Sequence, residues 1–188
     1  MAIKIFIDQG HNPQNPNAGA EGNGLREQDL VYYIGEELAA LLNANPDFEA
    51  RLSRNSPDEI LGTSIASSLS ARVRAANDWP ADYFISIHAN ASEITSASGS
   101  EAFVYSTSSE GYQFAAYLLR GLTEATGLSD RGVFARPTLY VLRATDMPAT
   151  LVEVGFITNA GDAALMNENP RLFAEGLYNG ILEYFGLN

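Results

Sequence analysis

The sequence predicts a single α/β domain in which helices cover both faces of a sheet. Two observations carry this prediction. Short apolar runs, rich in β-branched or aromatic residues, alternate along the chain with segments whose apolar residues recur every fourth position. The chain has 188 residues, 46% of them hydrophobic, which is enough for one well-buried core. We therefore expect one domain that spans residues 1–188.

Short apolar runs give the predicted strands. Residues 3–7, 48–52, 83–87 and 150–154 are too short for isolated helices and are bounded by polar or turn-forming residues. Residues 102–105 are predicted as a fifth strand and residues 139–142 as a sixth. Because helical patterns separate most of these runs, the alternation favours an α/β sheet covered by helices on both faces.

Apolar residues at four-residue spacing predict two long helices. They are Leu30, Ile34, Leu38 and Leu42 in one segment, and Phe173, Leu177, Ile181 and Phe185 in the other. Each set defines one buried face. Further helices are expected over residues 67–77 and 110–126, and after Asn159. Asn169 is predicted to cap the last helix, because Pro170 fits the first helical position.

Residues 92–100 are predicted to form a mobile loop over one edge of the sheet. Their composition of Ser, Thr, Ala and Gly is typical of loops. No internal repeat is visible, and the loop does not resemble a domain boundary.

Composition excludes several classes of function. The formal net charge of -12 repels phosphate backbones and anionic lipids, so nucleic-acid and membrane-surface partners are not expected. No run has the roughly 20 apolar residues that a membrane span needs, and the first residues resemble a strand rather than a signal peptide. With no cysteine, a disulfide framework and a thiolate nucleophile are excluded. Any metal site must use histidines and carboxylates.

Both histidines of the chain directly follow predicted strands. His11 comes after the first strand and His88 after the third. In open α/β sheets, ligands bind in the crevice beyond the carboxyl ends of the strands. Either histidine alone is explained as well by an ordinary hydrogen bond or by exposure, but the shared placement favours a common functional site.

Two glutamates occupy positions where an unpaired carboxylate is costly. Glu27 lies on the inward face of its helix, three residues before Leu30. Glu153 lies inside the apolar segment 149–157. A buried ionised carboxylate must be paired, hydrogen-bonded or metal-bound. The alternatives are a Glu27 turned toward solvent at the helix start, and a Glu153 on an exposed strand edge.

Two histidines and one glutamate form a ligand set that catalytic zinc uses, with the fourth position open for water. The separations along the chain do not match the short helical motif of many metalloproteases. Spacing alone therefore does not identify the site.

The ordered motifs resemble those of zinc-dependent N-acetylmuramoyl-L-alanine amidases. The motifs are IDQGH (7–11), GLRE (24–27), SARVRAAN (70–77), FISIHAN (84–90), GSE (99–101), DRGV (130–133) and MPATLVEVGFITN (147–159). Their order matches as well, and the resemblance covers nearly the whole chain. One departure is Gln9, where the family often has proline or another small residue.

The resemblance implies a twisted mixed sheet of about six strands, flanked by helices on both faces. It implies one Zn²⁺ held by His11, Glu27 and His88, with Glu153 as the catalytic acid and base. The expected reaction is hydrolysis of the amide bond between N-acetylmuramic acid and the L-alanine of the stem peptide. Peptidoglycan is the expected partner, and the bacterial cell wall the expected place of action.

Four further residues are candidates for supporting roles. Asp8 is a candidate for orienting a ligand histidine, because metal-bound imidazoles usually donate their other ring N–H to a partner. Asn90 and Glu101 are candidates for contacts with the sugar or stem peptide, and Arg143 for a bidentate contact with a substrate carboxylate. Ordinary loop hydrogen bonds or surface ion pairs explain all four equally well.

Two other functions are compatible with the same residues. One is a zinc peptidase that cuts within the stem peptide, and the other is a non-catalytic peptidoglycan-binding module. The presence of Glu153 argues against a silent module, which has no need of it. We expect a monomer. Because the net charge of -12 does not attract an anionic wall, a separate domain or partner is expected to target the protein.

Overall fold

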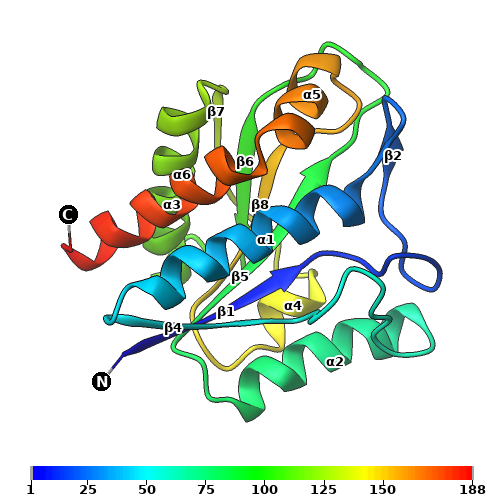
Figure 1. Cartoon of the computed structure of the whole chain (residues 1–188). Coiled ribbons are helices and arrows are strands. Elements are labelled where there is room, and N and C mark those ends of the chain that lie inside the picture. The colour runs from blue at the N-terminus through cyan, green and yellow to red at the C-terminus, as the bar shows by residue number, and fades with distance from the viewer. Residues whose placement is uncertain (1, 188) are drawn as a thin grey trace.

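The fold has three layers, with a six-stranded sheet between two groups of helices (Figure 1). The computed structural model describes residues 2–187. The elements in chain order are β1 (Ile3–Gln9), β2 (Glu21–Gly22), β3 (Leu25–Arg26), α1 (Glu27–Ala44), β4 (Phe48–Leu52), α2 (Ile65–Asp78), β5 (Tyr83–Asn90), β6 (Ser100–Val104), α3 (Glu110–Thr126), β7 (Asp130–Ala135), α4 (Tyr140–Arg143), β8 (Ala149–Phe156), α5 (Ala160–Glu168) and α6 (Pro170–Phe185). Strands β2 and β3 pair separately.

The main sheet is mixed and has the order β4-β1-β5-β8-β6-β7. Strands β4, β1, β5 and β8 are parallel, β6 runs antiparallel to β8, and β7 runs parallel to β6. The carboxyl ends of β1, β5 and β8 and the start of β6 therefore lie at the same end of the sheet. This architecture confirms the predicted fold class.

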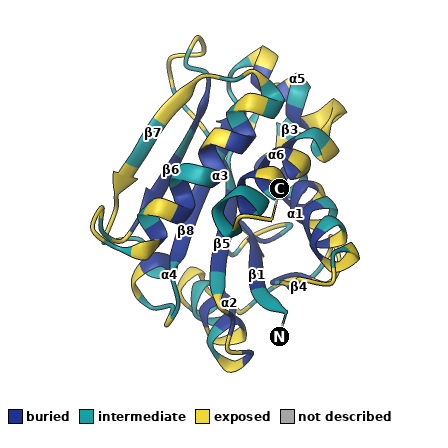
Figure 2. Cartoon of the chain, turned by 90° about the vertical axis from the view of Figure 1, so that its left-hand side faces the viewer, coloured by how far each residue is buried: buried dark blue, intermediate teal, exposed yellow. Residues whose placement is uncertain are grey.

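Helices α1, α3 and α6 cover one face of the sheet, and α2 and α4 lie on the other (Figures 1 and 2). The first face carries the larger core, built around residues such as Ile34, Leu118 and Leu177. The second carries a smaller cluster that includes Phe6 and Phe84. The edge strand β7 is largely exposed, as Figure 2 shows. Among the described residues, no helix is long and apolar enough to cross a membrane.

Five of the six predicted strands are present, and the predicted strand at residues 139–142 is wrong. That segment forms the short helix α4, which buries Val141 and Leu142 in the smaller cluster. A run of four apolar residues is too short to show either period, so the sequence did not distinguish the two structures. The sixth strand is β7, whose exposed residues and Gly132, with a φ of 106°, conceal it in the sequence.

Two local predictions also need correction. The Asn169 side chain makes no capping hydrogen bond, because this residue ends α5 and begins α6 and lacks the extended backbone of a usual cap. Asn159 does cap α5, by accepting from the N–H groups of Gly161 and Asp162. The loop before Ser100 joins β5 to β6 and so passes the end of β8 within the sheet, rather than lying over an edge. Its Ser98 hydroxyl donates to Asp162.

Candidate metal centre

Three predicted ligands converge where β1 and β5 end and α1 begins. Glu27 Oε1 lies 3.2 Å from His11 Nε2 and 2.9 Å from His88 Nδ1. The two imidazole rings are nearly perpendicular, at 77°, with centroids 4.8 Å apart. One ligand atom from each residue can be chosen so that all three lie within 4.8 Å of one another. This group of one carboxylate and two imidazoles could hold a metal ion.

Backbone contacts fix the positions of His11 and Glu27, and His88 is held by strand β5. His11 follows β1 in a left-handed conformation with a φ of 65°, and its carbonyl accepts from Arg72. Glu27 is the first residue of α1. Its Oε2 accepts from the N–H of Ala20 at 2.9 Å, and its Oε1 accepts from the N–H of Ala89 at 3.1 Å. The site therefore rests on two strands and the start of a helix, which is a rigid base.

Two glycines leave the space that these side chains occupy. A Cβ atom at Gly10 would lie 2.5 Å from His88 Cε1. A Cβ atom at Gly19 would lie 2.8 Å from Glu27 Oε2 and 2.9 Å from His11 Cδ2. Both positions thus require the absence of a side chain, since such contacts are far inside van der Waals distance.

Glu27 is ionised in this setting. Burial alone would raise the pKa of its carboxyl, but hydrogen bonds with His11 and His88 and their charges lower that pKa well below its ordinary value. Glu27 is only 4% exposed, so its ionised carboxyl is stabilised by these partners rather than by water. The prediction that Glu27 points inward is confirmed.

The surroundings of Glu153 shift its pKa in the opposite direction, upward. It faces the same side of the sheet as His88, its register partner on β5. Its Oε2 is buried without a hydrogen-bond partner among the described residues. Burial, followed by the negative charges of Glu27 and Glu101, raises the pKa of this carboxyl to about 8. The group is therefore protonated at neutral pH until a cation is placed nearby.

A buried ion pair between Asp8 and Arg72 lies next to the histidine cluster and contacts the backbone of His11. Asp8 Oδ1 accepts from Arg72 Nη1 at 2.5 Å, and Asp8 Oδ2 accepts from the Ser86 hydroxyl at 2.7 Å. These contacts outweigh burial and lower the pKa of Asp8. Among the described residues, the carboxylate of Asp8 accepts hydrogen bonds from Arg72 and Ser86 and from no histidine ring. Its link to His11 runs through Arg72, which also holds the carbonyls of Gln9 and His11.

The unusual Gln9 is accommodated by its neighbours. Its side chain is fully buried, and its Oε1 accepts from the N–H of Arg54 at 3.0 Å. Space for it comes from Gly35 on α1, where a Cβ atom would lie 2.6 Å from Gln9 Cγ. The Gln9 side chain thus lies between α1 and the segment that follows β4.

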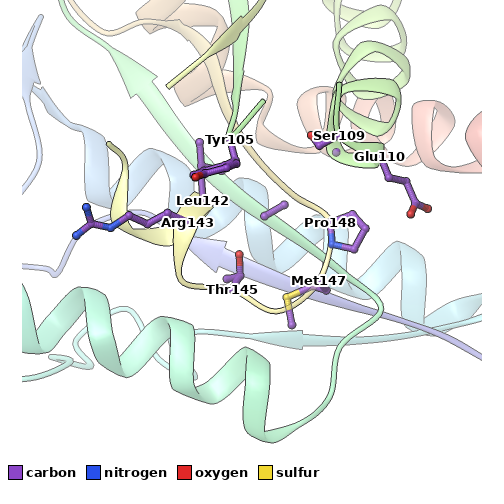
Figure 3. Close-up of a pocket in the computed structure, with 10 residues that line it drawn as sticks. Tyr105, Ser109, Glu110, Leu142, Arg143, Thr145, Met147 and Pro148 are labelled. Carbon is purple, nitrogen blue, oxygen red and sulfur yellow. The ribbon is translucent and has the colours of Figure 1, made fainter. Parts of the chain in front are cut away.

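The other three candidates, Asn90, Glu101 and Arg143, lie at two different places in the fold. Asn90 Nδ2 donates to Glu101 Oε1 at 2.7 Å, and Glu101 lies opposite Glu153 in the sheet. Arg143 lies instead at the other end of β8, against a pocket of about 310 Å³ formed with Tyr105 and Glu110 (Figure 3). A second hollow, of about 120 Å³, adjoins His11 and His88 and is lined mainly by apolar groups such as Leu151. Arg143 is therefore separate from the histidine cluster.

Sequence reasoning missed the role of Arg72. A signal was present, because Arg72 lies three residues after Leu69 and four before Ala76 on the inward face of a predicted helix. The roles of Gly10 and Gly19 carried no comparable signal. Their importance depends on side chains from other segments, which only the fold brings together.

Comparison with known proteins gives consistent matches over nearly the whole chain. The Amidase_3 family model, described as N-acetylmuramoyl-L-alanine amidase, matches residues 5–183. The sporulation-specific N-acetylmuramoyl-L-alanine amidase of Bacillus subtilis (strain 168) is 34% identical over 98% of this chain and 69% of its own length. The N-acetylmuramoyl-L-alanine amidase LytC of the same organism is 35% identical over 96% of this chain, which spans only 35% of that protein.

A solved structure matches the fold equally well. The catalytic domain of CwlV, an N-acetylmuramoyl-L-alanine amidase from Bacillus (Paenibacillus) polymyxa var. colistinus, superposes with a TM-score of 0.86 and 31% identity. The match covers 99% of each chain.

Proposed function

The chain belongs to the N-acetylmuramoyl-L-alanine amidase family, and from that premise we propose that it hydrolyses the amide between the lactyl group of N-acetylmuramic acid and L-alanine. The observation that carries the proposal is the convergence of His11, Glu27 and His88 beside the buried carboxyl of Glu153. Residues 1–188 act as one catalytic domain in this proposal.

The donor set fits Zn²⁺. Two imidazole nitrogens and one carboxylate oxygen converge, as in catalytic zinc sites that leave one position open. Glu27 is already ionised, and His11 Nε2 and His88 Nδ1 both face the same carboxylate oxygen. When bound, zinc polarises the substrate carbonyl and lowers the pKa of water toward roughly 7.

Glu153 is proposed to move the protons. Its carboxyl is buried, and its pKa of about 8 in the metal-free protein falls when a cation lies nearby. The carboxylate can then take a proton from the attacking water and return it to the nitrogen of the departing L-alanine. An amine is a poor leaving group until it is protonated, so this transfer is needed for the C–N bond to break.

Peptidoglycan as the substrate places the reaction at the bacterial cell wall. The net charge of -12 gives the domain little attraction for an anionic polymer, so a separate domain or partner is proposed to bring it there. The domain itself is proposed to act as a monomer.

Mass spectrometry of digested peptidoglycan tests the proposal. Purified peptidoglycan is incubated with chelated protein and with protein given zinc back. We expect intact stem peptides with free L-alanine amino termini only in the zinc sample. Fragments cut inside the stem would instead assign a peptidase, and tight zinc binding without cleavage would assign a binding module.

A further inference from the structure

The face of β6 and β7 on the side of the metal centre carries aromatic residues, of which Phe103 is buried and two others are exposed. Phe103 and Phe134 are register partners on these strands, with ring centroids 6.4 Å apart. Phe134 is 43% exposed, and Tyr105, which follows β6, is 52% exposed. Helix α3 packs on the opposite face of these strands, so the Phe134 and Tyr105 rings border solvent on the side of the metal centre.

Two arginines lie near the aromatic strip of Phe103, Tyr105 and Phe134 and have no acidic partners among the described residues: Arg136 lies over Phe103, and Arg143 lines a pocket with Tyr105. Arg136 Cζ lies 5.1 Å from the centre of the Phe103 ring, and Arg143 Cζ lies 5.5 Å from that of Tyr140. Within residues 2–187, neither guanidinium has a carboxylate within ion-pair distance. The nearby Glu110 is engaged with the hydroxyl groups of Tyr83 and Tyr184 and extends away from Arg143 (Figure 3). In a chain with a net charge of -12, exposed arginines without carboxylate partners favour an anionic ligand.

The strip lies further along the strands that carry Glu101 and Glu153. Glu101 is the register partner of Glu153, and Phe103 is that of Leu151, so β6 runs away from the site toward Tyr105. Four residues of strand separate Glu153 from Ala149, the level of Tyr105, which corresponds to about 13 Å. A peptide whose first nitrogen lies over the metal centre would reach the two arginines at about its third or fourth residue.

We propose that Arg136 and Arg143 bind free carboxylates in the distal half of an acidic stem peptide, which contacts the exposed rings of Tyr105 and Phe134. This inference rests on the proposed function. Arginine suits the task, since its planar group binds a carboxylate through two parallel hydrogen bonds while it stacks on a ring.

Two probes that differ only in charge test the inference. One is a muramoyl tetrapeptide with a diaminodicarboxylic acid at its third position, and the other is the same compound with its distal carboxylates converted to carboxamides. Both carry isoglutamine at the second position. For the zinc-loaded protein we expect kcat/KM to be about tenfold higher for the carboxylate probe, mainly through KM.

The double variant Arg136→Gln with Arg143→Gln should bring this ratio close to one. Arg171→Gln is the matched control, because Arg171 is an exposed arginine on α6, on the other side of the sheet. It should keep the wild-type ratio. An unchanged ratio in the double variant, or equal use of both probes by the wild type, would overturn the inference.

Binding of the free tetrapeptides separates this inference from the proposed function. Calorimetry gives Kd for the carboxylate and carboxamide peptides without any turnover. A preference that depends on the two arginines supports the inference even if the amide is not cleaved. Equal Kd values for both peptides would overturn it even if cleavage occurs.

Discussion

Glu101 and Glu153 lie directly opposite each other on β6 and β8, yet their hydrogen bonding is unequal. Glu101 accepts from Asn90 Nδ2 at 2.7 Å and from Arg131 Nε at 3.3 Å. Glu153 Oε2 is buried without a partner in the described chain. Burial, with the neighbouring charges of Glu27 and Glu101, raises the pKa of Glu153 to about 8, so this carboxyl keeps a proton at neutral pH.

This asymmetry makes the stability of the metal-free protein depend on pH. The pKa of Glu153 is about 8 in the folded chain against 4.5 as its ordinary value, so the folded state binds more protons between these values. Stability should therefore fall as pH rises from 5 to 8, by roughly 2 to 4 kcal/mol from this group. Glu153→Gln should remove that loss. Urea denaturation of chelated wild type and variant at both pH values measures it, and parallel pH dependence in the two proteins would contradict the assignment.

The same substitution should separate catalysis from metal binding. Glu153→Gln removes the proton-transferring group but none of the three proposed ligands, so zinc content should be unchanged while turnover falls roughly 10² to 10⁴ fold. His11→Ala should lose zinc and activity together. Metal analysis and release of free amino termini give the two readouts. A Glu153→Gln protein with wild-type turnover would rule out the mechanism.

Removing Arg72 should destabilise the whole domain. Arg72→Met leaves Asp8 as an unpaired buried charge and leaves the carbonyls of Gln9 and His11 without their donor. The expected loss is about 3 to 5 kcal/mol. In the double variant Asp8→Asn with Arg72→Met, part of this stability should return, because the uncompensated charge is gone. If Arg72→Met alone unfolds at the wild-type urea midpoint, the ion pair has no such role.

A methyl group at Gly19 should weaken metal binding with little effect elsewhere. The added Cβ would lie 2.8 Å from Glu27 Oε2 and 2.9 Å from His11 Cδ2, so both side chains must shift. We expect Gly19→Ala to lower zinc affinity by at least about tenfold, as displaced supporting contacts do in other metal sites. Gly161→Ala is the control, since its Cβ would meet only Asn159 Oδ1, at 3.3 Å. Competition with a fluorescent chelator compares them, and equal affinities would refute the steric argument.

Most of the fold follows from apolar periodicity along the chain. Long helices such as α1 and α6 and the buried strands β1, β5 and β8 have enough residues to show their period. Prediction was wrong where the segment is short, as in α4, and missed β7, whose residues are largely exposed. In those places tertiary contacts, and not local pattern, decide the structure.

The candidate site shows a similar division. His11, Glu27, His88 and Glu153 could be singled out because a buried or strand-end polar residue is unusual in its local sequence. The contacts that position these four residues could not be predicted from the sequence. Arg72 reaches Asp8 and His11 across more than sixty residues, and Gly19 matters only because Glu27 folds over it. Such relationships exist only after the strands have assembled.

The alternation along β8 also limits how the gene can change. Glu153 and Leu151 face the metal centre, while Val152 and Val154 lie in the larger core. A single inserted or deleted codon between positions 149 and 153 would exchange the two sets, sending a carboxylate into the core and a valine toward the candidate metal site. Codons can be added more freely in the loop between Asn90 and Ser100, where no such alternation is at stake. Length variation in descendants of this gene should therefore accumulate between the strands and spare β8.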